Sequence, residues 1–535
     1  MNNPETIDAL TNWVPLVLPE ILLVAAACVL FLGGTFRAGR NLWGSVALAS
    51  LAAAALAAWL TPGPADPGPA QLYAAPVLLD SLAVLVKGLA LAGGGVLVLL
   101  GWDEVPEKQA AEYHACLLVI VAGTSLTGMA NELITLFLAL ELISIPTYIL
   151  LYLPRHDNAA QEASLKYFLL SVFSSALMLF GFSYLYGVGG TTNIPALTRA
   201  LATVESGALP AAALVALVMV VAGLGFRIAA VPFHFYAPDV YQGTTAGAAA
   251  LLAFIPKVAG FVALVRVLGF APEGSLLEAL TLGRAKVVPG LLLGSQVSTL
   301  FWILAAVTMT LGNVLALLQD NLKRLLAYSS VAHAGYMLIG LAVAPYLRGV
   351  DSPGGVEALL FYLAAYGAMT IGAFAVISYL NTPQHPIETV DDLAGLSRSH
   401  PGVALLMMIF LFSLIGIPLT GGFAGKFLLF WGAMSVPVDV GDPSSLEQAR
   451  LFRILALIGV INAAVGAWYY LRIVAAMYLR NPLRPAQGGR RWPALATIGI
   501  CAVLTLALGV PPLLGLLVGA ARDAVPHVPQ LRAER

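Results

Sequence analysis

Charged side chains are scarce in this chain of 535 residues, and the scarcity excludes whole classes of protein. Asp, Glu, Lys and Arg together make up 10% of the sequence, whereas hydrophobic residues make up 59%. Water-soluble domains of this total length need far more polar side chain to cover their surfaces. The 27 basic and 28 acidic residues leave a formal net charge of −1, so no nucleic-acid partner is indicated. The composition therefore predicts a polytopic membrane protein embedded in a lipid bilayer.

Cysteine is also nearly absent, which bears on cofactors. Cys28, Cys116 and Cys501 stand far apart, without a CxxC or Cys/His spacing. This pattern argues against an iron–sulfur cluster or a structural zinc, because such sites need clustered ligands. The sequence has no Gly-rich phosphate loop after a strand and no nucleophile triad either. We therefore expect no cofactor and no metal in this chain, and no covalent chemistry of its own.

Long apolar runs, by contrast, occupy most of the sequence. The first run follows an uncharged-to-acidic leader instead of a basic one, so we interpret it as a retained span and not as a signal peptide. A membrane-spanning helix needs about 20 apolar residues. The predicted fold is all-α and polytopic, with about 14 transmembrane helices at residues 14–36, 42–60, 77–100, 113–130, 132–153, 163–187, 209–231, 246–270, 298–318, 325–345, 356–380, 401–431, 451–480 and 491–520.

Lys and Arg are distributed unevenly over the loops between these runs. If the N-terminus lies outside, the inner loops hold eleven basic residues and the outer loops five, leaving aside the C-terminal tail. Cytoplasmic loops of membrane proteins carry the excess of Lys and Arg. The distribution predicts that both termini lie on the outer side of the membrane, periplasmic or lumenal.

Two of the apolar runs are interrupted in a way that a helix facing lipid would avoid. Pro232 and Pro418 each lie among glycines and other small residues, and a break at membrane depth frees backbone carbonyls that only protein or water can satisfy. Broken segments at corresponding places in two halves are typical of inverted-repeat transporters. We therefore predict two five-helix repeats of opposite topology. The expected segments are 1–112, an N-terminal three-helix unit; 113–270, the first repeat; 298–480, the second repeat; and 481–535, the last helix and tail.

Four ionisable residues lie within or beside apolar segments in the stretch 223–260: Arg227, His234, Asp239 and Lys257. An ionisable group at membrane depth costs roughly 2.5–3.5 kcal/mol on insertion, and it usually faces a bundle interior or a hydrated path. The stretch therefore indicates a membrane protein that moves charge.

Glu141 and Lys257 are the deepest members of this charged set. Glu141 lies near the middle of the fifth run, where a carboxylate normally has a cationic partner, and Arg227 and Lys257 are the two alternatives. A carboxyl group hydrogen-bonded to a neighbouring helix is the structural alternative. Desolvation and a carboxylate neighbour act on the pKa of Lys257 in opposite senses. Proton exchange near neutral pH is its functional interpretation, and a fixed ion pair between two helices is the structural one.

The remaining ionisable residues are assigned by their position along the chain. Lys426 follows a Gly-Gly pair in the twelfth run, so we interpret it as a second proton site. His234 and His333 are expected between the cations, where histidine can relay protons or serve as a structural group. Asp239, in the loop after the first break, is interpreted as a loop-ordering or entrance carboxylate. Lys87, in the third run, is either a pathway residue or, as we favour, a lysine whose ammonium group snorkels to the surface.

Seven stretches together carry a resemblance to a known family. They are ELISIPTYIL at 141–150, KYFLLSVFSSALMLFG at 166–181, GTTN at 190–193, VPFHFYAPDVYQG at 231–243, NLKRLLAYSSVAHAGY at 321–336, GIPLTGGFAGKFLLF at 416–430 and AAVGAWYYLRIV at 463–474. With them the chain resembles the antiporter-like membrane subunits of respiratory complex I. The last stretch and the early Glu141 motif favour the N-type branch of that family.

The resemblance implies a proton-translocating subunit of a redox-driven pump in the bacterial inner membrane, bound to the other membrane subunits of complex I. It also implies that flavin, iron–sulfur clusters and quinone belong to partner subunits, with no cofactor in this chain. By motif matching, the proton pathway of the family falls on Glu141, Lys257, Lys426, His234 and His333.

Position 227 departs from the family's pattern, which has a lysine there as the partner of the glutamate. Arginine is effectively never deprotonated, so Arg227 can modulate the charge of Glu141 but can hardly carry a proton. We hypothesise that the Glu141–Arg227 pair opens and closes and so shifts the proton affinity of Lys257. Two charges about 4 Å apart at an effective dielectric constant of about 20 interact by about 4 kcal/mol, which is enough for such a shift. A sodium/proton antiporter subunit and a non-conducting scaffold are the alternatives that the sequence leaves open.

Overall fold

The computed structural model describes residues 13–36, 39–61, 75–154, 157–202, 210–268, 294–347, 354–382, 386–438, 443–482 and 492–525. These residues form helices and connections, with isolated β-bridges and no β-strand in the described ranges. The all-α prediction is confirmed. The first half contains α2 (Leu18–Gly33), α3 (Arg40–Leu60), α5 (Ser81–Gly101), α6 (Ala110–Met129), α7 (Leu133–Tyr152), α8 (Asn158–Gly189), α9 (Ile194–Ala202), α10 (Ala211–Ile228), α11 (Ala237–Gly243) and α12 (Ala246–Val267). The second half contains α14 (Gly294–Leu317), α15 (Leu322–Val343), α16 (Val356–Leu380), α17 (Leu396–Ser399), α18 (Pro401–Ile415), α19 (Gly421–Met434), α20 (Pro443–Leu479), α21 (Trp492–Ala507) and α22 (Leu513–Asp523).

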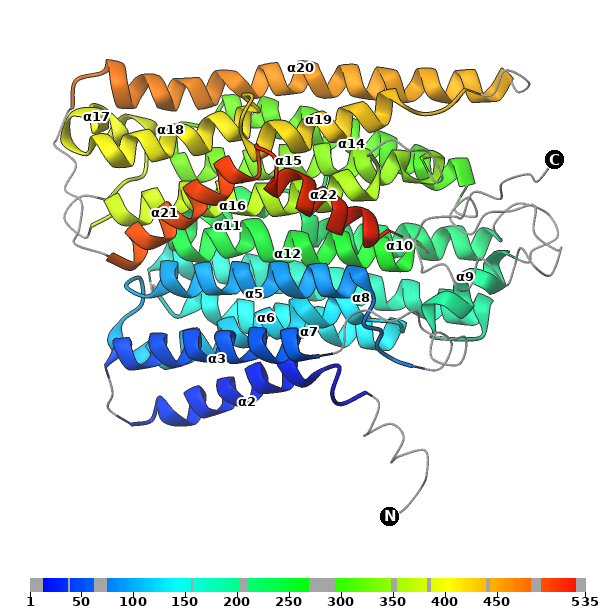
Figure 1. The fold of residues 1–535 in the computed structure, drawn as a ribbon, viewed down its shortest axis with the longest axis horizontal. Helices are drawn as coiled ribbons and strands as arrows, with labels where there is room; N and C mark the ends of the chain where they lie inside the picture. Colours follow the sequence, from blue (N-terminus) through cyan, green and yellow to red (C-terminus); the bar gives the residue numbers. More distant parts are fainter. Residues whose placement is uncertain are drawn as a thin grey trace, which may run out of the picture.

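The long helices lie side by side as one bundle, with α2 and α3 at one edge and α20 at the opposite edge (Figure 1). Eleven helices of the described chain are long and apolar enough to cross a membrane, which agrees with a multi-pass membrane protein. The helices α12, α15 and α16 form the centre, because almost all of their residues are buried. The outer helices present large apolar side chains on their exposed faces, as lipid contact requires.

Each of the fourteen predicted runs falls on one or two described helices, but two of them are not single helices. The run 401–431 divides into α18 and α19, and the run 491–520 divides into α21 and α22. The first division is the break that the sequence analysis predicts at Pro418, whereas the second was not predicted, since the residues at that break are themselves apolar. Three of the fourteen runs hold helices that are shorter than the eleven helices long enough to cross a membrane. The count of fourteen spans therefore stays a prediction.

Both proline-associated breaks occur where the sequence predicts them. The helix α10 ends at Ile228, and Pro232 lies in the connection before α11 begins at Ala237. In the second half, Gly416 ends α18 with a φ of 95°, a left-handed conformation that glycine adopts without steric cost. Helix geometry resumes at α19 after Pro418. Each break leaves helix-terminal carbonyl groups inside the bundle.

Candidate functional site

Glu141 and Arg227 form an ion pair between α7 and α10, in which Arg227 is buried and Glu141 is partly exposed. Arg227 Nη2 lies 3.2 Å from Glu141 Oε1, and the Ser175 hydroxyl of α8 donates to the same oxygen at 2.6 Å. Arg227 also donates to the carbonyl of Leu140 at 3.2 Å and to the Ser144 hydroxyl at 2.8 Å. Of the two cations that the sequence offered, the structure therefore pairs Arg227 with Glu141, and the planar guanidinium is held by several acceptors at once.

Lys257 is fully buried in α12, and the hydrogen bonds of its ammonium group reach backbone carbonyls. Its Nζ donates to Ser330 of α15 at 2.8 Å and to Ile228, the last residue of α10, at 3.2 Å. The described residues provide no carboxylate within ion-pair distance of it. Lys257 thus binds a carbonyl that the first helix break has freed, and carbonyl dipoles stabilise its ammonium group in place of an opposite charge.

Lys426 makes the corresponding contacts at the second break. Its Nζ donates to the carbonyls of Leu414 at 2.7 Å and Ile415 at 3.0 Å, the last two residues of α18. A helix C-terminus carries partial negative charge, which favours a cation there. Both predicted lysines therefore lie at the carbonyl end of a broken helix, although Lys257 reaches its break from a neighbouring helix and Lys426 from the second piece of the same one.

His333 lies between the two lysines within a cluster of buried tyrosines. Its Nδ1 is 2.6 Å from the Tyr362 hydroxyl and its Nε2 is 3.0 Å from the Tyr470 hydroxyl. Its ring packs against Tyr366 at 5.2 Å and Tyr336 at 5.6 Å between centroids. Both imidazole nitrogens therefore have a hydroxyl partner, so either one can hold the proton.

The tyrosine rings also reach the lysines. Lys257 Nζ lies 5.9 Å from the centre of the Tyr366 ring, and Lys426 Nζ lies 4.8 Å from the centre of the Tyr336 ring. The Tyr366 hydroxyl donates to the Ser330 hydroxyl at 2.8 Å. The sequence analysis missed these tyrosines, because it counted them with the apolar residues of the core. Their spacing was a usable signal, since Tyr336 follows the histidine by three positions and so shares its helix face.

His234 is not brought into this cluster. It lies half-buried in the connection between α10 and α11. In the described part of the chain no hydrogen bond joins its side chain to Lys257 or His333, and its Nδ1 is buried without a partner. Its predicted place between the cations therefore has no support from the contacts.

Asp239 occupies a helix and not the predicted loop. Pro238 suits the first turn of α11, and an acidic residue is favoured there. The carboxylate pairs with Lys166 of α8 at 2.7 Å and with Arg324 of α15 at 2.6 Å. Burial raises the pKa of Asp239, but the hydrogen bonds from Lys166 and Arg324 lower it by a larger amount. The pKa therefore lies below its ordinary value. Lys323 donates to two carbonyls at the other end of α11.

Lys87 does not snorkel to the surface as the sequence analysis favoured. Its ammonium group is buried and pairs with Glu20 of α2 at 3.0 Å, while the Ser125 hydroxyl of α6 donates to the same carboxylate. The sequence analysis did not single out Glu20, because a carboxylate this close to the start of an apolar run can lie at the membrane interface. The pair joins helices of the N-terminal part and lies apart from the cluster around His333.

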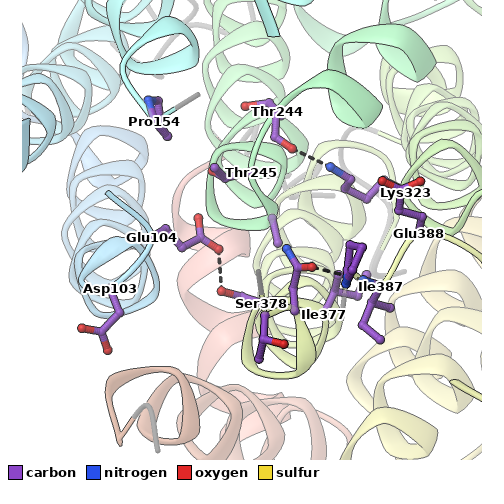
Figure 2. Close-up of a pocket in the computed structure, with 14 residues that line it drawn as sticks. Asp103, Glu104, Pro154, Thr244, Thr245, Lys323, Ile377, Ser378, Ile387 and Glu388 are labelled. Atoms are coloured by element: carbon purple, nitrogen blue, oxygen red, sulfur yellow. Dashed lines mark hydrogen bonds between the residues drawn. The ribbon is translucent and has the colours of Figure 1, made fainter. Parts of the chain in front are cut away.

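A pocket of about 440 Å³ opens where several parts of the chain meet (Figure 2). Its walls come from the loop after α5, the start of α12 and the end of α16, and also from Pro154, Lys323 and residues 386–388. In Figure 2 Glu104 points to Ser378 and Lys323 points to the backbone of Thr244, and both contacts are hydrogen bonds. Among the described residues no group of three His, Cys, Asp or Glu side chains could hold a metal ion.

Comparison with known proteins gives consistent matches over nearly the whole chain. A model of the family described as "NADH:quinone oxidoreductase/Mrp antiporter, TM" matches residues 130–441. NADH-quinone oxidoreductase subunit N of Trichlorobacter lovleyi is 35% identical over 514 residues, which cover 96% of this chain and 93% of that protein. A chain of respiratory complex I from Thermus thermophilus is 30% identical with a TM-score of 0.72, covering 94% of this chain and 99% of that one. A chain of the Mrp complex from Dietzia sp. DQ12-45-1b has the same fold, with a TM-score of 0.76 at 20% identity and coverages of 96% and 98%.

Proposed function

Because the chain belongs to the NADH:quinone oxidoreductase/Mrp antiporter transmembrane family, we propose that it is a proton-translocating membrane subunit of a complex I type NADH-quinone oxidoreductase. Protons would pass through its buried side chains, coupled to quinone reduction in other subunits. The flavin, the iron–sulfur clusters and the quinone belong to those partner subunits. The chain lies in a bacterial inner membrane beside the other membrane subunits, with both termini on the periplasmic side.

The observation that carries the proposal is the unbroken row of contacts between the two buried lysines. Lys257 faces the Tyr366 ring, this ring packs on His333, His333 packs on Tyr336, and Tyr336 faces Lys426. Every member carries a group that can hold or pass a proton. Structural charges would be expected in fixed ion pairs, whereas these two lysines donate only to backbone carbonyls.

The Glu141–Arg227 pair is the proposed switch for this row. Arg227 precedes Ile228, whose carbonyl accepts a hydrogen bond from Lys257. A movement of the arginine toward or away from Glu141 therefore acts on the lysine in two ways, through the field of the pair and through the position of its acceptor. Arg227 keeps its own proton throughout, so the pair modulates the charge around Lys257 and carries no proton itself.

The test is the number of protons pumped per electron by the assembled enzyme carrying Lys257→Met. We expect this ratio to fall, because methionine fills the same space without a titratable group. Lys426→Ala is expected to lower it as well, while assembly is retained.

The matched control removes a different buried lysine, in the double variant Glu20→Gln with Lys87→Met, whose ion pair lies outside the row. This control should leave the ratio per assembled complex unchanged. An unchanged ratio in Lys257→Met would contradict proton transfer through the row and would favour a non-conducting scaffold.

A further inference from the structure

The helix that carries Lys257 is held at its C-terminal end by an aspartate that precedes α5. Arg266, in the last turn of α12, makes two hydrogen bonds of 2.6 Å to the two carboxylate oxygens of Asp80. Asp80 is also the N-cap of α5, where it accepts from the Ala83 amide at 2.8 Å. This bidentate pair is largely buried and geometrically specific, so it fixes one end of α12 against the start of α5.

The N-terminal end of α12 is held by a glutamate that follows α5. Both oxygens of Glu104 accept from the backbone amide of Gly247, at 3.0 and 2.8 Å, and the Ser378 hydroxyl of α16 donates to the same carboxylate. The first amides of a helix lack partners within the helix, and a carboxylate satisfies them and complements the helix dipole. Figure 2 shows Glu104 directed at Ser378, whereas the neighbouring Asp103 points away.

The middle of α12 is held as well. Phe254 lies one turn before Lys257, and a methyl group added at either Gly93 of α5 or Gly367 of α16 would come within 2.4 Å of its ring. The ring therefore occupies a slot that exists only because both neighbours are glycine. The helices α5 and α16 thus confine α12 from two sides, close to the lysine.

We propose that Glu104 is a positioning residue for Lys257, acting through the N-terminal end of α12. The lysine has no carboxylate partner of its own among the described residues, so its alignment with the carbonyl of Ser330 depends on where its helix sits. Glu104 joins that helix to α16, which supplies Tyr366 to the row of contacts. The residue lies before the region that the family model matches. The inference rests on the proposed function, because it concerns the alignment of the same proton path.

Two variants separate the contact from the charge. Glu104→Ala removes both the carboxylate charge and its contact with the Gly247 amide. Gly247→Ala keeps the charge, but the new methyl group would lie 2.5 Å from Glu104 Oε2, so the carboxylate must move away from the amide of residue 247. Each is expected to lower the protons pumped per electron by at least about twofold, since small misplacements of reacting groups are costly. The double variant, with Glu104→Ala and Gly247→Ala together, should have the same ratio as Glu104→Ala alone, because the two changes remove the same contact. Glu104→Gln keeps an acceptor oxygen and should retain most of the ratio.

The controls are Asp103→Ala, which removes a charge from the same loop, and Gly88→Ala, a helix glycine with nothing within 4 Å of the added methyl group. Both should leave the ratio unchanged. The ratio is measured per assembled complex, so a purely structural role would reduce the amount of complex and leave the ratio intact.

The outcomes separate the two proposals. A normal ratio in Glu104→Ala, or an equal fall in Asp103→Ala or Glu104→Gln, overturns the positioning role. If Lys257→Met itself leaves the ratio unchanged, the proposed function fails first. If Lys257→Met lowers the ratio and Glu104→Ala does not, only the positioning role is lost.

Discussion

The side chain of Arg227 fixes the charge and the geometry of the ion pair that Glu141 forms. It is the only described cation that forms an ion pair with this carboxylate, and three further acceptors hold it in place. The family resemblance leads us to expect a lysine at this position, and a lysine could satisfy fewer of those acceptors at once because it lacks the planar fork. The arginine therefore keeps the charge of the pair constant and restricts its geometry.

Replacement of Arg227 separates the two roles. Arg227→Met leaves the half-buried Glu141 without its cation, and we expect a loss of stability of about 3 kcal/mol together with a lower ratio of protons per electron. Arg227→Lys retains the charge and should keep the ratio close to that of the parent enzyme. Heat inactivation and the pumping ratio of the assembled complex measure the two effects. Equal behaviour of the two variants would rule out the ion pair as the switch.

The sequence predicted the charged members of the site better than its hydroxyl members. A lysine or glutamate in an apolar run is conspicuous because of its cost, so Glu141, Lys257 and Lys426 could be identified without coordinates. Tyr336 and Tyr366 were not singled out, since tyrosine is ordinary in a buried helix and only packing reveals which residue its hydroxyl meets. His234 was expected to join the cluster on the same reasoning as His333, and only tertiary structure separates the two.

Among the helices, the two broken ones bring the backbone into the site. The carbonyls that α10 and α18 leave unpaired are the groups that accept hydrogen bonds from Lys257 and Lys426. Residues 416–420 turn the chain between α18 and α19, and Gly422 then lies directly against Ser413 of the preceding helix. The geometry of the second break therefore depends on a close approach that only glycine permits.

Gly422→Ala tests this dependence. The added methyl group would lie 1.9 Å from the carbonyl oxygen of Ser413, so the backbone must shift, and we expect a destabilisation of about 1–3 kcal/mol. Because Leu414 and Ile415 end the same helix, the acceptors of Lys426 should move and the pumping ratio should fall. Gly402→Ala is the control, since nothing lies within 4 Å of its methyl group. A tolerated Gly422→Ala variant would show that the break can relax without cost.

On the scale of the whole molecule, the N-terminal helices contribute directly to the position of the centre. Asp80 and Glu104 flank α5 and contact the two ends of α12, which is entirely buried. The sequence analysis treated 1–112 as a separate unit, and those boundaries stay a prediction. The contacts add that Glu104 of this unit binds both α12 of the first half and α16 of the second half, at the pocket shown in Figure 2.

Cysteine labelling tests the predicted orientation of the bundle. In a background with Cys28 replaced by serine, the remaining Cys116 and Cys501 are buried. We expect a membrane-impermeant maleimide to label Glu388→Cys only from the cytoplasmic side and Val438→Cys only from the periplasmic side, as the distribution of Lys and Arg predicts. Intact spheroplasts and inverted vesicles provide the two directions of access. Labelling with the opposite sidedness would show that the orientation is reversed.

The sequence by itself determined the membrane class, the apolar runs and the positions of the costly charges, because each of these follows from local hydrophobicity and composition. It also located both helix breaks, since proline and glycine act on the backbone where they stand. The residues alone left Arg227 and Lys257 as alternative partners of Glu141, the family resemblance favoured Arg227, and the structure contains that ion pair. Only the tertiary structure decided that His333 lies among tyrosines and that Glu104 contacts α12. These contacts join residues far apart in the chain, and the packing of whole helices selects them among many combinations that the sequence permits.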